Sequence, residues 1–267
     1  MTTDPFYKAH WRDINPTRMS TYRDGFKWNN NAELVYQGAQ IENGLIVGDF
    51  GCGPGWVAAE FARRVGRTGQ VYAFDINPEF LDIARANAKD AGVSDWFQAL
   101  ESDGVTLPLA DNTLDCITAR NTLMYVDDPA ATLREFYRVL KPGGRAHVIE
   151  GDWYMMVVEP VDHDDWRTFV KAASHACKNA DMGRKLHHDF ADTGFQNLEV
   201  SIHAEPDVDG RLTGMIRNMA NYALESGHLS EPDIDKVWQC IKSAQADQAY
   251  LATAPQFIVT GEKSERC

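Results

Sequence analysis

Apolar residues in the middle of the chain follow two alternating patterns, one typical of buried strands and one typical of helices. Short apolar runs predict strands over residues 45–50, 70–75, 96–100, 114–120 and 145–150. Apolar residues spaced three or four apart predict helices over 56–65, 78–91 and 129–140, the last of which is stopped by Lys141-Pro-Gly-Gly144. This alternation through short links predicts an α/β fold: a doubly wound, mostly parallel sheet with helices on both faces.

The regions on either side of this core follow other patterns. The first 44 residues are polar and show no strand pattern, but they are rich in aromatic side chains (Phe6, Tyr7, Trp11, Tyr22, Phe26 and Trp28). After residue 150, helical patterns cover about 166–180 and 185–191, and strand patterns cover 197–204 and 255–261. These last two strands bring the predicted sheet to seven strands.

Two further helical patterns lie between the last two predicted strands, within residues 205–250. The sequence contains no internal repeat and no low-complexity tract. We therefore expect a single domain over residues 1–267, with its core at 45–151. The arm at 1–44 and the insertion at 205–250 are expected to form a helical cap, with the insertion as a lid over an acceptor site.

Charge and composition disfavour several classes of protein. The net charge is −13, whereas a protein that binds nucleic acid through its phosphates needs a basic face. No apolar run reaches the roughly 18 residues of a membrane span, and the start of the chain lacks the features of a signal peptide. The five cysteines are scattered, without the spacing of metal ligands, so we expect reduced thiols and a cytoplasmic protein.

The most informative segment joins the first predicted strand to the helix after it. It reads Asp49-Phe-Gly-Cys-Gly-Pro-Gly55, and its glycines allow a ligand to approach the backbone closely. A dinucleotide fingerprint would need a small residue where the chain has Trp56, and the motif of a phosphate-binding loop is absent. The segment therefore predicts a ligand-binding loop that is not built around a diphosphate.

Two acidic residues extend this candidate site. Asp49 makes the mouth of the loop negative, which suits a cationic group such as an amine or a sulfonium. Asp75 ends the second predicted strand, where a carboxylate can accept two hydrogen bonds from a ribose diol. The alternative role for Asp75 is that of a helix N-cap, which needs no ligand.

In their order and spacing, these motifs resemble those of the class I S-adenosylmethionine-dependent methyltransferases. The resemblance covers residues 45–151 and implies a Rossmann-like methyltransferase fold with S-adenosylmethionine as its cofactor. It implies that the cofactor is bound by Asp49, Gly51, Cys52, Gly53, Asp75, Ile76, Asp103, Gly104 and Arg120. For Asp103 and Gly104 the alternative is an ordinary β-turn.

Within this class the chain is most similar to the small-molecule branch related to ubiquinone and menaquinone methyltransferases. The similarity is carried by Glu150-Gly-Asp-Trp153, Gly183-Arg-Lys-Leu186, Thr193-Gly-Phe195 and the segment 257–263. It implies methylation of a small, largely apolar or aromatic acceptor on oxygen, nitrogen or carbon. Many relatives carry a His pair after the fourth strand, but this chain has Asn121-Thr-Leu-Met-Tyr125 there, so any base must lie elsewhere.

Four residues are candidates for a general base, and the sequence does not choose among them: Asp152, Tyr154, His10 and His187. The candidates for the acceptor-binding wall are Trp153, Met215 and Met219. Trp153 follows the fifth strand, at the edge where open α/β sheets bind ligands. For the two methionines the alternative is ordinary core packing.

Two other functions and one other site compete with this interpretation. An NAD-dependent oxidoreductase would share the sheet and the loop, and a regulator could bind an adenosyl ligand without turnover. Asp162-His-Asp-Asp165 could be a metal site, but acidic residues in the first turn of a helix explain it better. No metal site is therefore expected.

Overall fold

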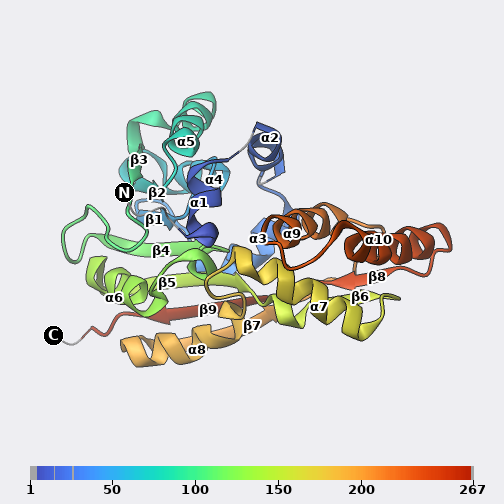
Figure 1. Ribbon diagram of the computed structural model, residues 1–267. Helices are drawn as coiled ribbons and strands as arrows, with labels where there is room; N and C mark the ends of the chain where they lie inside the picture. Colours follow the sequence, from blue (N-terminus) through green and yellow to red (C-terminus); the bar gives the residue numbers. More distant parts are fainter. Residues whose placement is uncertain (1–4, 15, 26, 266–267) are drawn as a thin grey trace.

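The computed structural model describes residues 5–14, 16–25 and 27–265, and a seven-stranded sheet forms its centre (Figure 1). The strand order is β3-β2-β1-β4-β5-β9-β7. The strands are β1 Ile46–Phe50, β2 Gln70–Asp75, β3 Phe97–Glu101, β4 Leu114–Arg120, β5 Leu140–Gly151, β7 Gln196–His203 and β9 Gln256–Glu262. β1 to β5 pair in parallel, whereas β9 runs antiparallel to both β5 and β7. The predicted mostly parallel sheet of seven strands is confirmed.

Helices cover both faces of this sheet, as predicted. On one face α3 (Asn30–Tyr36), α4 (Trp56–Val65) and α5 (Pro78–Asp90) bury apolar side chains against β1 and β2. On the other face lie α6 (Pro129–Val139), α7 (His163–Ala173) and α8 (Met182–Thr193), which contribute to the larger core. The central strands β1, β2 and β4 are mostly apolar because they are buried on both sides, whereas the edge strand β7 is mostly exposed.

Capping side chains set where several helices begin. Asn77 accepts the N–H of Glu79 at 2.8 Å, directly before Pro78 at the first position of α5. Asp162 accepts hydrogen bonds from the N–H groups of Asp164 and Asp165 and so caps α7. In the described part of the chain no group of three or more His, Cys, Asp or Glu side chains could hold a metal ion.

The N-terminal arm and the insertion form helices that meet each other. The arm contains α1 (Phe6–Arg12) and α2 (Pro16–Gly25), and the insertion contains α9 (Thr213–Glu225) and α10 (Glu231–Ala246). Arg18 of α2 donates to the Tyr222 hydroxyl of α9 at 2.9 Å. Asn77, just after β2, donates to the carbonyl of Trp11 in α1 at 2.8 Å. The arm therefore bridges the carboxyl end of the sheet and α9; Phe26 and Cys267 lie outside the described residues.

The helix expected over 166–180 is wrong at both ends. α7 begins at His163, because Asp162 caps it, and it ends at Ala173. A 3-10 turn, η6 (Ser174–Ala176), follows, and Cys177 is extended. The next two residues, Lys178 and Asn179, donate their N–H groups to the carbonyl of Met124, at 2.9 and 3.0 Å. These tertiary hydrogen bonds replace those that a continued helix would have made.

Two further details were not predicted correctly. The segment 141–144, which was expected to stop a helix before a strand at 145–150, lies within β5, where the pairing register with β4 shifts between Leu114 and Cys116. A second, two-stranded sheet pairs β6 (Val157–Glu159) with β8 (Leu251–Thr253). Runs of three residues are too short to show a periodic pattern, so the sequence could not reveal this sheet.

Two expectations from composition can be compared with the described residues. None of their helices has the length and apolar character that crossing a membrane requires. Cys52, Cys116, Cys177 and Cys240 are all free thiols.

Candidate active site at the carboxyl edge of the sheet

In the glycine loop between β1 and α4, two glycines pack closely against neighbouring side chains and one faces open space. All three glycines have positive φ, with values of +73°, +50° and +75° at Gly51, Gly53 and Gly55. A Cβ at Gly51 would lie 2.3 Å from the Thr122 hydroxyl, and one at Gly55 would lie 2.5 Å from Ala84. A Cβ at Gly53 would meet no atom within 4 Å. Gly51 and Gly55 thus allow close packing, whereas the backbone of Gly53 faces open space that a ligand can occupy.

Asp75 lies directly across from this open position. Its carboxylate accepts the N–H of Gly53 at 2.8 Å and the N–H of Asn77 at 2.9 Å, one on each oxygen. Burial raises the pKa of Asp75 to about 6, although its backbone hydrogen bonds act in the opposite direction. A carboxylate has about four lone-pair sites, so Asp75 can still accept a hydrogen bond from a ribose hydroxyl. The helix N-cap is Asn77, not Asp75.

Asp49 is a buried carboxyl group in the same loop. It accepts the Thr118 hydroxyl at 2.9 Å and has only 3% of its surface exposed. Burial raises its pKa to about 7, and the negative charge of nearby Asp75 adds to that increase. Two acids in a poorly hydrated site favour a ligand that brings positive charge.

Cys52 and Arg120 complete this part of the site. Gly51 and Cys52 both donate their N–H groups to the carbonyl of Phe74, which ties the loop to β2. Burial holds the pKa of the Cys52 thiol well above its usual value, so the side chain stays uncharged. Arg120 ends β4, and its buried Nε has no hydrogen-bond partner within the described residues. That donor is available to an anionic group, such as the carboxylate of an amino acid.

The residues expected at the adenine end lie together, but Asp103 has a local role. A Cβ at Gly104 would lie 3.6 Å from the side chain of Ile76, so these residues flank one space. The Asp103 carboxylate accepts the N–H of Val105 at 2.8 Å and that of Thr106 at 2.6 Å. Asp103 therefore has a local structural role, and an adenine contact by this residue stays a prediction.

Beyond the glycine loop, aromatic rings from three parts of the chain form what we call the aromatic cluster: His10, Trp11, Tyr22, Tyr125 and Tyr222. Ring centroids are 5.0 Å apart for Trp11 and Tyr125 and 5.1 Å apart for His10 and Tyr222. Tyr22 packs on Trp11 at 5.1 Å, and Asn218 donates to the hydroxyls of Tyr22 and Tyr222. The sequence indicated an aromatic-rich arm, but not that Tyr125 and Tyr222 would meet it.

His10 is the candidate base whose surroundings suit that role best. The residue is only 6% exposed, and Nδ1 lies within hydrogen-bonding distance of the Phe6 carbonyl. Because a carbonyl only accepts, Nδ1 carries the proton, and Nε2 presents a lone pair. Nε2 is buried and has no partner among the described residues. Burial lowers the pKa of His10 to about 4, with the positive charge of Arg18 acting in the same direction, so the ring is neutral at pH 7.

The other candidate bases are less suitable. Asp152 is fully buried, but its carboxylate forms an ion pair with Arg184 and accepts the N–H of Tyr154, so it has a local structural role. The Tyr154 hydroxyl donates to Ser174 at 3.1 Å. His187 is exposed on α8, a helix that packs against β5 and β9. None of these three contributes a ring to the aromatic cluster.

Of the residues expected to bind the acceptor, one contacts the aromatic cluster and two pack in or against the hydrophobic core. Trp153 is buried and stacks on Tyr222 of the aromatic cluster, with 6.4 Å between ring centroids. Met219 is 1% exposed and belongs to the main hydrophobic core, which is the alternative we considered for it. Met215 is partly buried against that core.

Glu150 is a buried acid at the end of β5 that was not among the predicted site residues. Its Oε1 accepts the N–H groups of Thr122 and Leu123 at 2.7 and 2.6 Å, while Oε2 has no partner in the described chain. Burial raises its pKa to about 8. Glu150 thus holds the loop after β4, which carries Tyr125, and its position at the carboxyl end of a strand was the available signal.

The buried acids make the stability of the empty protein depend on pH. A carboxyl group whose pKa is higher in the folded state stabilises the fold below its unfolded pKa, and this contribution is lost as pH rises through the folded value. With the pKa of Asp49 near 7, we expect the free energy of unfolding to fall by roughly 2–4 kcal/mol between pH 4 and pH 8. Urea titrations at several pH values should show a flatter profile for Asp49→Asn; an unchanged profile would contradict the raised pKa.

Comparison with known proteins agrees with this geometry. The family described as "Methyltransferase domain" matches residues 48–148. The ubiquinone/menaquinone biosynthesis C-methyltransferase UbiE of Klebsiella pneumoniae subsp. pneumoniae is 33% identical over 176 residues, which cover 60% of this chain and 69% of that protein.

Solved structures show the same fold. A structure described as a putative methyltransferase from Bacillus halodurans C-125 superposes with a TM-score of 0.64 at 19% identity, covering 88% of this chain and 100% of that one. Geranyl diphosphate C-methyltransferase from Streptomyces coelicolor A3(2), solved with S-adenosyl-L-homocysteine, gives a TM-score of 0.55 at 18% identity, covering 87% and 78%.

These findings favour S-adenosylmethionine over NAD as the cofactor, and an enzyme over a non-catalytic binding protein. The reaction is methyl transfer to a small-molecule acceptor. The chain belongs to the class I S-adenosylmethionine-dependent methyltransferases, in the family of UbiE.

Proposed function

We propose that this methyltransferase acts on a small, largely apolar or aromatic acceptor that binds at the aromatic cluster, with His10 as general base. The observation that carries the proposal is the buried, unpartnered Nε2 of His10 among aromatic rings. An aromatic acceptor can replace ring-to-ring contacts with its own. Its acidic proton can then pass to Nε2.

The cofactor fits the residues around the glycine loop. Asp49 suits the ammonium group, Asp75 the ribose hydroxyls, and Arg120 the carboxylate, while Gly53 leaves room for the chain that joins them. Ile76 and Gly104 are suited to flank the adenine. When bound, S-adenosylmethionine supplies an electrophilic methyl group on a sulfonium sulfur.

The protein's own contribution is alignment, exclusion of water and proton transfer. Trp11, Tyr125 and Tyr222 surround His10 and keep water away from Nε2. Because the imidazole is neutral at pH 7, its lone pair is available without prior deprotonation. A hydroxyl or an activated ring carbon loses a proton when it is methylated, so one base serves either acceptor. The UbiE relatives are named as C-methyltransferases, which favours carbon without excluding oxygen or nitrogen.

A panel of acceptors tests this function. The protein is incubated with methyl-labelled S-adenosylmethionine and matched sets of phenols, anilines, activated ring carbons and aliphatic amines. We expect label in at least one aromatic product, together with S-adenosylhomocysteine. Label confined to aliphatic amines would overturn the acceptor class.

Loss of the Asp75 carboxylate is expected to weaken cofactor binding. Asp75→Ala removes a charged hydrogen-bond acceptor from the ribose, so the affinity for S-adenosylmethionine should fall by about 1.5–3 kcal/mol. Titration calorimetry measures this loss. Asp162→Ala, which removes an exposed helix cap on α7, is the control and should leave the affinity unchanged.

The arm and the insertion are proposed to open when the acceptor enters. Trp11, Arg18 and Tyr22 join the arm to the rest of the chain through Asn77, Tyr222 and Asn218, so release of these contacts would expose the aromatic cluster. We expect S-adenosylhomocysteine and an acceptor to slow amide exchange in residues 5–30 and 208–240 more than in strands 71–75 and 114–119. Equal protection in all four regions would argue against a lid.

Two broader expectations remain part of this proposal. The net charge of −13 supports a small-molecule acceptor over a nucleic acid. The free state of the four described thiols supports a reducing, cytoplasmic environment.

A further inference from the structure

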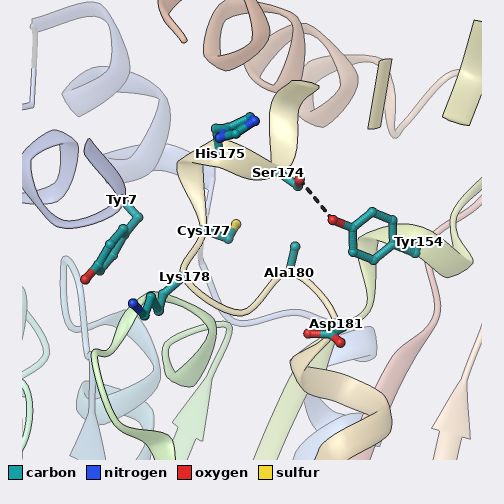
Figure 2. A pocket seen from close by; sticks show the side chains of 8 residues that line it. All are labelled: Tyr7, Tyr154, Ser174, His175, Cys177, Lys178, Ala180 and Asp181. Atoms are coloured by element: carbon teal, nitrogen blue, oxygen red, sulfur yellow. Dashed lines mark hydrogen bonds between the residues drawn. The ribbon is translucent and has the colours of Figure 1, made fainter. Parts of the chain in front are cut away.

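An open cavity of about 380 Å³ lies beside α1 and the segment 174–181 (Figure 2). It is lined by Tyr7 of α1, by Tyr154 after β5 and by residues of the segment 174–181. Its volume falls in the range of small-molecule sites. None of the cofactor contacts proposed above uses these residues.

The cavity adjoins the proposed methyl-transfer site through two elements. Tyr7 lies three and four residues before His10 and Trp11 on α1, so all three share one side of that helix. On the inner wall, Cys177 points into the cavity in Figure 2, and its thiol is a hydrogen-bond partner of Tyr125 in the aromatic cluster. The cavity and the aromatic cluster therefore share helix α1 and meet at the contact between Cys177 and Tyr125.

Charge in the cavity is unequal on its two sides. On one side Lys178 lies with its ammonium 5.4 Å from the centre of the Tyr7 ring, and no ion pair of Lys178 is found in the described chain. The acid near it, Asp127, already accepts the Tyr7 hydroxyl and pairs with Lys8 at 3.4 Å. Lys8 also interacts with the charge of Asp103, so among the described residues Lys178 is the cation on this side that is not already paired with an acid.

On the opposite side of the cavity the charges are paired. Asp181 forms an ion pair with Lys185 at 2.7 Å, so its charge is neutralised. The Tyr154 hydroxyl donates to Ser174, and Ser174 donates to the carbonyl of Lys171 at 2.7 Å. Cys177 and Ala180 supply the less polar surface between the two sides (Figure 2).

We propose that this cavity binds the end of the acceptor that is not methylated, and that this end carries an anionic group, such as a carboxylate, paired with Lys178. The apolar body of the acceptor would pass Cys177 and Ala180 and reach the aromatic cluster. The proposal rests on the proposed function only in placing the reacting end of the same molecule beside His10.

The test compares an acid with its neutral amide, using probes that cannot be methylated in place of an acceptor. In the presence of S-adenosylhomocysteine, binding of 3-phenylpropionate and 3-phenylpropionamide is followed by the NMR shifts of the His175 ring, at the rim of the cavity. We expect the acid to bind the unmodified protein about tenfold more tightly than the amide. Lys178→Gln should reduce that ratio to about one.

Lys89→Gln is the control, because it removes the same charge from the exposed surface of α5, whose residues do not line the cavity. It should leave the ratio unchanged. Equal affinities for acid and amide in the unmodified protein, no binding of either probe, or equal effects of the two Lys→Gln variants would each overturn the subsite.

These outcomes can be separated from the proposed function. Neither probe has a nucleophile, so their binding does not depend on His10 as a base. If the acid is preferred but no aromatic compound is methylated, the subsite stands and the proposed acceptor class fails. If phenols are methylated but acid and amide bind equally, the reverse holds.

Discussion

Gly53→Val is expected to abolish binding of S-adenosylmethionine while the protein stays folded. The φ of Gly53 is +50°, and a side chain there would extend into the open space of the glycine loop, where no protein atom lies within 4 Å of the Cβ. The side chain would therefore occupy the position proposed for the cofactor, in addition to straining the backbone. Calorimetry measures the binding, and circular dichroism measures the fold.

Gly92→Val separates these two effects. Gly92 also has a positive φ, +72°, and a Cβ there would also meet nothing within 4 Å, but it follows α5 outside the candidate site. It should carry a similar backbone strain and bind S-adenosylmethionine normally. If Gly53→Val binds the cofactor as tightly as Gly92→Val, the loop is only a turn.

His10→Asn is expected to lower kcat by about 10²–10⁴-fold, the usual contribution of a general base. The affinity for S-adenosylmethionine should change little, because His10 lies in the aromatic cluster and not in the glycine loop. The measurement uses whichever aromatic acceptor the panel identifies. His187→Asn is the control, since His187 is exposed on α8.

The pH dependence gives a second readout of the same residue. Burial lowers the pKa of His10 to about 4, so the base is unprotonated throughout the neutral range. We expect kcat to be level between pH 6 and pH 8 and to fall only at lower pH. A decrease centred near pH 6.5 that persists in His10→Asn would show that another group is the base.

The centre of the sheet could be predicted from the sequence because strands β1, β2 and β4 are buried on both faces. The runs at β1, β2 and β4 are mostly apolar, and capping residues such as Asn77 mark the helices between them. The end of α7 could not be predicted, because it depends on hydrogen bonds from Lys178 and Asn179 to Met124, more than 50 residues away. Local propensity carries no information about such contacts.

For the candidate site too, residues in local motifs could be predicted, and residues that depend on distant contacts could not. The glycine loop and Asp75 are local motifs, so their positions followed from the sequence. His10 could not be chosen from four candidates, because its burial depends on Tyr125 and Tyr222, which are distant in the chain. Asp152 was expected at the carboxyl edge of the sheet, and it lies there. Its structural role could not be foreseen, because it depends on an ion pair with Arg184, 32 positions away.

A crystal structure with S-adenosylhomocysteine bound tests the central claim most directly. The account predicts that the ribose hydroxyls lie within hydrogen-bonding distance of Asp75, that the ligand passes over Gly53, and that its sulfur faces the aromatic cluster at His10. A ribose bound away from Asp75, or a sulfur that faces away from His10, would contradict it.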